Sequence, residues 1–187
     1  MRYPSAEHYS TRCPISHRPA FRTEEPLFCR CPVCGTVFVA STPQKEQSRP
    51  AVSCCGNAME PLEICRDESL AGEHEMRFVV FGGFEKSAVR IAVDGGNHPM
   101  DPEHRIEWMY LRTFQGGQLK YLPERSRSMM QFAFADEDAY VYCDRDVCRM
   151  GREHCQFECK RGMVAYAYCS RHGLFRLPLT GESGAEK

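Results

Sequence analysis

The sequence of 187 residues lacks several features that would define a broad class of protein. It has no excess of charge of one sign, because 24 basic and 25 acidic residues leave a formal net charge of -1. A chain without a bulk basic charge is a poor phosphate binder, so we expect no nucleic-acid partner. It also has no apolar run of about eighteen residues, so we expect no membrane span. The first ten residues lack the apolar core of a signal peptide, so we expect a cytoplasmic protein.

Cysteine, in contrast, is abundant, with 12 residues beside 7 histidines. A secreted disulfide scaffold would need a signal peptide, which the sequence does not show. Reduced cysteines at short spacings more often bind metal ions. The positions of these residues therefore carry most of the functional information.

Changes in composition along the chain predict its division into parts. A small cysteine-rich segment cannot bury a sizeable core, so it needs a metal or another staple. The expected parts are a loosely ordered N-terminal extension at 1–27, the cysteine-rich module at 28–66, a larger domain at 67–180 with a cysteine-rich insertion at 143–160, and a tail at 181–187.

The sequence of the larger domain predicts β-structure throughout. Residues 77–81 and 88–93 are rich in β-branched and aromatic residues on either side of Gly82-Gly83, which predicts a hairpin. Further short strands are expected within 106–114, 118–122, 132–135, 139–142 and 163–168. Many short strands with frequent turns and no long amphipathic helix predict an all-β sandwich or barrel.

Two cysteine pairs in the module have the spacing of a metal site. Cys31 and Cys34 form a knuckle followed by Gly35, and the adjacent pair Cys54 and Cys55 is followed by Gly56. Thiolates three positions apart converge on one ion, and the glycine permits the tight turn. Four thiolates in so small a module suit tetrahedral iron or zinc, and their chemistry leaves the choice of metal open.

A second set of metal-binding residues is spread along the larger domain. His98 and His104 flank a proline-containing loop just before an expected strand, and His74 opens the first strand of the hairpin. Cys169 and His172 are three positions apart, so a single loop can direct both at one ion.

These motifs together resemble a known family. Cys54-Cys55-Gly56-x-x-Met59, behind the first knuckle, resembles desulforedoxin. His98-Pro99-Met100-x3-His104-x-Ile106-x-Trp108, with the late Cys169-x-x-His172-Gly173-Leu174, resembles superoxide reductase. The whole chain is therefore similar to a two-iron desulfoferrodoxin. The resemblance implies a desulforedoxin-like module followed by an immunoglobulin-like β-sandwich.

The resemblance also implies sites and an activity. One iron would be bound by Cys31, Cys34, Cys54 and Cys55, and a catalytic ferrous iron by His74, His98, His104, Cys169 and His172. That second iron would reduce superoxide to hydrogen peroxide and be re-reduced by an external donor such as rubredoxin or a related reductase. The family further suggests a homodimer and a role against oxidative stress in an anaerobe.

Two other functions fit the same residues. The chain would then be a non-catalytic iron protein for electron transfer, or an interaction module stapled by zinc. A five-residue ligand set argues against the zinc module, because structural zinc takes four ligands in a closed shell.

The residues before His74 depart from the family pattern. Superoxide reductases place a Glu-Lys pair there, whereas this chain has Gly72-Glu73. The lysine attracts superoxide, so an anion in its place is expected to slow anion capture. Either Glu73 takes the iron-capping role and another cation such as Arg77 or Arg171 substitutes for the lysine, or turnover is weak.

The insertion is the second departure. It contains four closely spaced cysteines, with His154 beside them: Cys143, Cys148, Cys155 and Cys159. Such a cluster favours a third metal, zinc or iron, over disulfides or free structural thiols.

Overall fold

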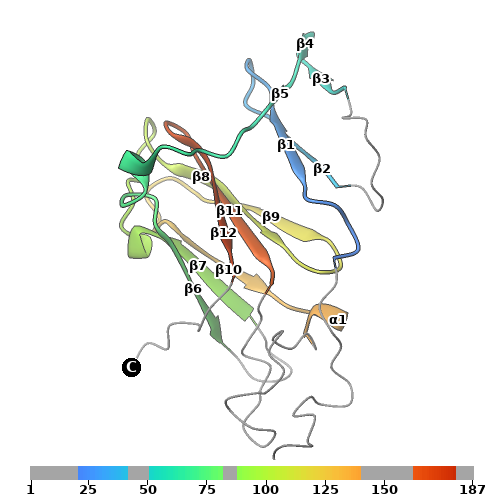
Figure 1. Cartoon of the computed structure of the whole chain (residues 1–187). Coiled ribbons are helices and arrows are strands. Elements are labelled where there is room, and N and C mark those ends of the chain that lie inside the picture. The colour runs from blue at the N-terminus through green and yellow to red at the C-terminus, as the bar shows by residue number, and fades with distance from the viewer. Residues whose placement is uncertain (1–20, 42–50, 82–87, 140–161, 180–187) are drawn as a thin grey trace, which may run out of the picture.

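The computed structural model describes residues 21–41, 51–81, 88–139 and 162–179. Two antiparallel sheets form the larger domain (Figure 1). One has the order β10-β7-β6, formed by Met129–Ala133, Ala88–Val93 and Met76–Phe81. The other has the order β12-β11-β8-β9, formed by Gly173–Pro178, Val164–Cys169, Ile106–Arg112 and Gly117–Tyr121. The prediction of an all-β sandwich is confirmed.

The main core lies between these two sheets. Strand β7 alternates between buried and half-buried residues, as a strand does when only one face packs on the core. Its inward residues Val89, Ile91 and Val93 meet Met109, Leu111 and Ala165 of the other sheet in one apolar cluster. This core holds the ends of both sheets in place, and the loops at one end carry the histidines.

The cysteine-rich module covers the outer face of the four-stranded sheet. It contains a sheet of order β2-β1-β5, formed by Val37–Ala40, Leu27–Arg30 and Glu60–Pro61, and a hairpin of β3 (Ser53–Cys54) with β4 (Asn57–Ala58). Phe28 of β1 packs on Trp108, Tyr110 and Tyr166, with ring centroids 4.9 to 5.3 Å apart. In Figure 1 strands β1 and β2 accordingly lie beside β8, β9 and β11.

Two details differ from the sequence expectations. Strand β12 was not expected, because only a loop carrying Cys169 and His172 was predicted there, yet it pairs with β11 along its whole length. Ala139 ends a single helical turn, α1 (Asp136–Ala139), instead of starting a strand.

Residues 21–26 of the expected N-terminal extension contact the four-stranded sheet. The Phe21 ring lies 4.9 Å from that of Phe114, and the guanidinium of Arg112 lies 3.8 Å above Phe21. Glu25 accepts hydrogen bonds from Tyr166 at 2.6 Å and from Arg176 at 2.7 Å. These contacts bind the segment to the four-stranded sheet, where it leads directly into β1.

No helix in the described residues is long and apolar enough to cross a membrane. Within the described residues there are also two 3-10 turns, η2 at Glu68–Leu70 and η3 at Asp94–Gly96. Each precedes one of the histidines, and both lie at the same end of the sandwich.

Candidate metal centres

Four separate segments bring the histidine–cysteine site together. His74 follows η2, His98 follows η3, and His104 lies just before β8. Cys169 ends β11, and His172 lies in the turn before β12. The ligand atoms of His74, His104, Cys169 and His172 all lie within 4.8 Å of one another. His98 joins them, because its Nε2 lies 3.1 Å from Nε2 of His74.

The four imidazole rings form a four-sided arrangement. Neighbouring ring centroids are 4.7 to 4.9 Å apart around the sequence His74, His98, His104, His172. The diagonal from His74 to His104 is longer, at 6.4 Å. Neighbouring rings meet at interplanar angles of 65 to 89°. Four nitrogens can thus surround one point, with room for further ligands on either side.

Backbone carbonyls set the direction in which two of these rings face. Nδ1 of His74 lies 3.0 Å from the carbonyl of Leu70, and Nδ1 of His98 lies 2.8 Å from that of Pro99. A carbonyl only accepts, so each Nδ1 carries the proton and each Nε2 keeps its lone pair. Histidines that bind metals are oriented by this kind of hydrogen bond.

The resulting lone pairs point at one another, which fits a cation between them. Two unprotonated Nε2 atoms at 3.1 Å have no proton to share. Nδ1 of His172 lies 3.2 Å from Nε2 of His74, and buried Nε2 of His104 has no hydrogen-bond partner among the described residues. The residues present therefore fit a metal ion, and imidazole nitrogens with a thiolate suit iron.

Burial favours the neutral form of three of the histidines, as metal binding requires. It lowers the pKa of His98 to about 4, an effect that the hydrogen bond to Pro99 opposes and the neighbouring histidines add to. Burial also lowers the pKa values of His74 and His104. Neutral imidazoles at physiological pH need no deprotonation before they bind an ion.

Cys169 is fully buried and lies on the inner side of the site. Its Sγ is 3.7 Å from Nδ1 of His172. Burial raises the pKa of this thiol, although backbone N–H groups of Arg171 and His172 partly offset the effect. A bound cation deprotonates such a thiol outright, so the thiolate and the metal would form together.

Ser170 joins the two loops that carry these ligands. Its hydroxyl accepts from the backbone N–H of Arg105 at 3.0 Å, and its own N–H donates to the Arg105 carbonyl at 2.9 Å. Asp101 in turn accepts from the N–H of His104 at 2.7 Å. His74 is fixed from another side, since its ring stacks on Phe175 with centroids 4.0 Å apart. Neither Ser170 nor Leu70 was singled out from sequence, where nothing marks a residue that acts only by positioning others.

The four cysteines of the module form the second metal centre. The ligand sulfurs of Cys31, Cys34, Cys54 and Cys55 lie within 4.8 Å of one another. Cys54 is 3.6 Å from Cys34 and 3.9 Å from Cys55. Metal–sulfur bonds of about 2.3 Å in a tetrahedron place sulfurs about 3.8 Å apart, so these separations fit one ion.

Each of the two cysteine-containing turns of this centre includes a glycine with a positive φ angle. Gly35 has φ 73° and Gly56 has φ 77°, in the left-handed region that glycine adopts readily. Cys34 is exposed, and its contacts with Thr36 lower the pKa of the thiol to about 6. Such a thiol is readily available as a thiolate. Of the cysteines given no ligand role, Cys29 is buried and Cys65 is half-buried.

The charged residues expected around the histidine–cysteine site differ in their surroundings. Glu73 is exposed, and its charge raises the pKa values of His74 and His104. Arg171 is also exposed, and its charge lowers the pKa of His104. Arg77 is held by Glu75 at 2.8 Å. Arg171 is thus the better placed of the two candidate cations.

The cluster predicted in the insertion, Cys143, Cys148, Cys155 and Cys159, lies outside the described residues. Among the described residues, the two clusters that could hold a metal ion are the four cysteines of the module and the histidine–cysteine site of the sandwich.

Comparisons with known proteins agree with a metal-binding β-sandwich of this kind. The family model for desulfoferrodoxin matches residues 82–177, about half of the chain. The chain belongs to the desulfoferrodoxin family. The match includes His98, His104, Cys169 and His172, whereas His74 and the cysteine module precede it.

A solved structure shares the fold. The crystal structure of the superoxide reductase from Treponema pallidum matches with a TM-score of 0.54 and 22% sequence identity. The alignment covers 82% of this chain and 98% of that chain. No curated protein matches the sequence.

Proposed function

We propose that this protein is a superoxide reductase whose iron is bound at the histidine–cysteine site. The observation that carries the proposal is the convergence of four imidazoles and one buried cysteine on a single point. A ferrous ion there would supply one electron, so that superoxide, one electron and two protons give hydrogen peroxide. The ion would then need one electron from an external donor before the next turnover.

The protein's own residues would control how superoxide reaches the site. His104 and His172 are only half-buried, whereas Cys169, His74 and His98 are buried, so solvent reaches the site from the side of His104 and His172. Solvent on that side can bring both the anion and its protons. Arg171, adjacent to His172, supplies a positive charge there, which favours an incoming anion.

The buried side of the site would control how readily the iron gives its electron to superoxide. Cys169 would bind as a thiolate, and a thiolate pushes electron density toward iron, as it does in thiolate-bound haem. The N–H groups of Arg171 and His172 that face its sulfur would moderate this effect. The hydrogen bonds to Leu70 and Pro99 would hold two imidazoles in the orientation that binding requires.

The rate of superoxide consumption tests the proposal. Superoxide generated by a radiolysis pulse should decay much faster with the reduced iron-loaded protein than alone. A His98→Ala variant should lose this acceleration, because it removes one of the four nitrogens. Asn97→Ala, one position away, is the matched control and should keep it. Equal decay with and without wild-type protein would contradict the proposal.

A second function is favoured by one specific observation. Glu73 places an anion beside the site, where it opposes the approach of superoxide. The same iron would then act as an electron-transfer centre that consumes superoxide slowly. Reversible oxidation by a protein partner, combined with superoxide decay at the spontaneous rate, would support this function instead.

We further propose that the four cysteines of the module bind iron. Their separations suit iron and zinc alike. Elemental analysis of the purified protein separates the two, and iron at this site gives the intense colour of ferric thiolates, whereas zinc gives none. A Cys55→Ser variant should lose that colour and keep the metal of the sandwich domain.

A further inference from the structure

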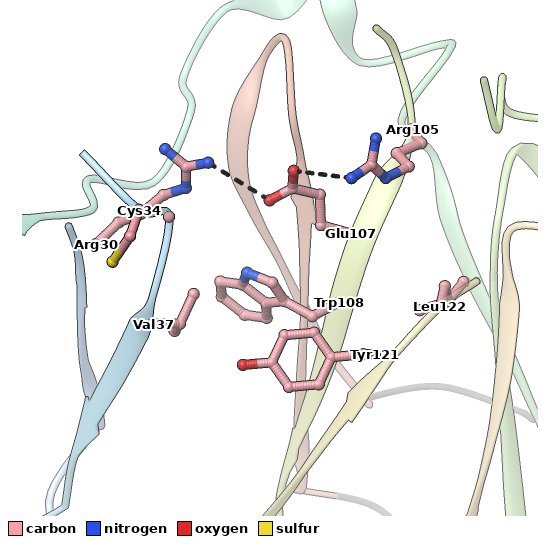
Figure 2. A pocket seen from close by; sticks show the side chains of 9 residues that line it. Arg30, Cys34, Val37, Arg105, Glu107, Trp108, Tyr121 and Leu122 are labelled. Atoms are coloured by element: carbon pink, nitrogen blue, oxygen red, sulfur yellow. Dashed lines mark ion pairs between the residues drawn. The ribbon is translucent and has the colours of Figure 1, made fainter. Parts of the chain in front are cut away.

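A pocket of about 260 Å³ lies between the cysteine module and strand β8. Arg30 and Val37 of the module form one wall, and Arg105, Glu107 and Trp108 form the other. Figure 2 shows these side chains, with Tyr121 and Leu122 beside them. Neither the histidine–cysteine site nor the proposed reaction uses this pocket.

The two guanidiniums of the pocket are not equally paired. Glu107 lies between them, at 3.8 Å from Arg30 and 3.5 Å from Arg105. Arg105 has a second carboxylate partner, Glu124 at 3.5 Å, and it donates to the Pro102 carbonyl at 2.7 Å. Charge-assisted hydrogen bonds are about 2.7 to 2.9 Å long, so the distance of 3.8 Å to Glu107 leaves Arg30 as the guanidinium that can pair with a further anion.

Two buried donors in the same pocket lack partners. Trp108 is completely buried, yet its indole N–H has no acceptor among the described residues, and the same holds for Nε of Arg30. In Figure 2 the indole nitrogen points toward Arg30 and Glu107, into the space that the ion pairs border. Buried N–H groups in proteins are nearly always hydrogen-bonded, so an acceptor is expected here.

We infer that this pocket binds a small organic monocarboxylate. Its oxygens accept from the indole N–H of Trp108 and from Nε of Arg30, and its charge pairs with the Arg30 guanidinium. Its apolar body lies against Val37 and Tyr121, a residue that is 61% exposed. The inference goes beyond the proposed function and does not depend on it, because none of these residues is among the five ligands of the histidine–cysteine site.

Trp108 is the only tryptophan of the chain, so its fluorescence reports on the pocket directly. The test titrates the full-length, metal-loaded protein with benzoate and with benzamide, its neutral counterpart. Benzoate should change the Trp108 emission in a saturable way, and benzamide should bind at least about tenfold more weakly, since it lacks the charge. No saturable change, or equal binding of the two compounds, would overturn the inference.

Variants separate this pocket from other places where an anion could bind. Arg30→Gln should weaken benzoate at least about tenfold, and Arg127→Gln, an exposed arginine elsewhere, should change it less than about twofold. Glu107→Gln should tighten benzoate, because it removes the competing anion. Tyr121→Ala removes an exposed wall of the pocket and should also weaken benzoate. This variant provides the test if Arg30→Gln fails to fold.

Benzoate bound at an open metal position would be insensitive to both Arg30→Gln and Tyr121→Ala. Unchanged affinity in the folded variants would therefore overturn the inference. Superoxide decay is measured separately, so a failure of the proposed function leaves this result unaffected.

Discussion

The Nε2 atoms of His74 and His98 lie 3.1 Å apart, although 24 positions and a complete hairpin separate the two residues. Each ring turns its Nδ1 to a backbone carbonyl, so neither Nε2 carries a proton to share. Two facing lone pairs repel unless a cation lies between them. This pair is the strongest structural reason to regard the site as a metal centre, and it includes the one histidine that the family match omits.

We predict that His74→Ala loses the metal of the sandwich domain. Even the loss of a group that only orients a ligand costs about 10-fold to 100-fold in affinity, and the loss of a ligand should cost at least as much. Metal content per chain and the visible spectrum of the loaded site measure the effect. Glu75→Ala, an exposed neighbour, should retain full occupancy. Full occupancy in His74→Ala would remove His74 from the ligand set.

We predict that Glu73→Lys speeds the capture of superoxide. It replaces a repelling charge by an attracting one near the site, and local fields of this kind change association rates by about tenfold or more. The second-order rate constant, measured at low and high salt, should rise and become more salt-dependent. Glu60→Lys makes the same change in net charge on the module and is the control. An unchanged rate in Glu73→Lys would show that Glu73 does not control access.

We predict that Glu25 contributes acid-sensitive stability. Burial raises the pKa of this carboxyl, but hydrogen bonds from Tyr166 and Arg176 outweigh burial and lower it. A lowered pKa means that the stabilisation is present above the pKa of the unfolded chain, near 4.5, and is lost as pH falls through the folded value. Glu25→Gln should cost about 1 kcal/mol at pH 7. The cost should shrink toward zero at pH 3.

Denaturant unfolding of both proteins at several pH values measures this difference. A cost for Glu25→Gln that stays the same from pH 7 to pH 3 would contradict an ionised hydrogen-bond acceptor. The same experiment tests whether residues 21–26 belong to the folded domain, because Glu25 is their main polar link to the sheet.

We predict that Cys148→Ala lowers the metal content by one ion per chain, as expected if the four cysteines of the insertion bind a third metal. Elemental analysis for zinc and iron measures the change. Cys65→Ala, a half-buried cysteine in neither of the described clusters, should leave the content unchanged. An unchanged content in Cys148→Ala would exclude the third site.

Much of the fold could be predicted because β6 and β7 are both rich in β-branched and aromatic residues and β7 alternates regularly. Strands β8 and β11 are covered on both faces, by the main core and by Phe28 of the module, so nearly all their residues are buried. The sequences of such strands are nearly continuous apolar runs, which can be recognised without the structure. Strand β12 was missed because its first residues belong to the metal-site motif, which drew the interpretation toward a loop.

The candidate sites were predictable where ligands are close in sequence. Cys31 with Cys34, and Cys169 with His172, have spacings that let one turn direct both side chains at an ion. His74 has no such partner nearby, and only the pairing of β6 with β7 brings it to His98. Positioning contacts such as Ser170 with Arg105, or the ring of Phe175 under His74, depend on tertiary packing and leave no local pattern.

The most direct test of the central claim is the product ratio when superoxide is added to the anaerobic, reduced protein in amounts below its iron content. Reduction gives one hydrogen peroxide per superoxide and no dioxygen, whereas dismutation gives half as much peroxide together with an equal amount of dioxygen. We expect the first result, with one ferrous ion oxidised per superoxide. The dismutation ratio, or iron that stays ferrous, would contradict it.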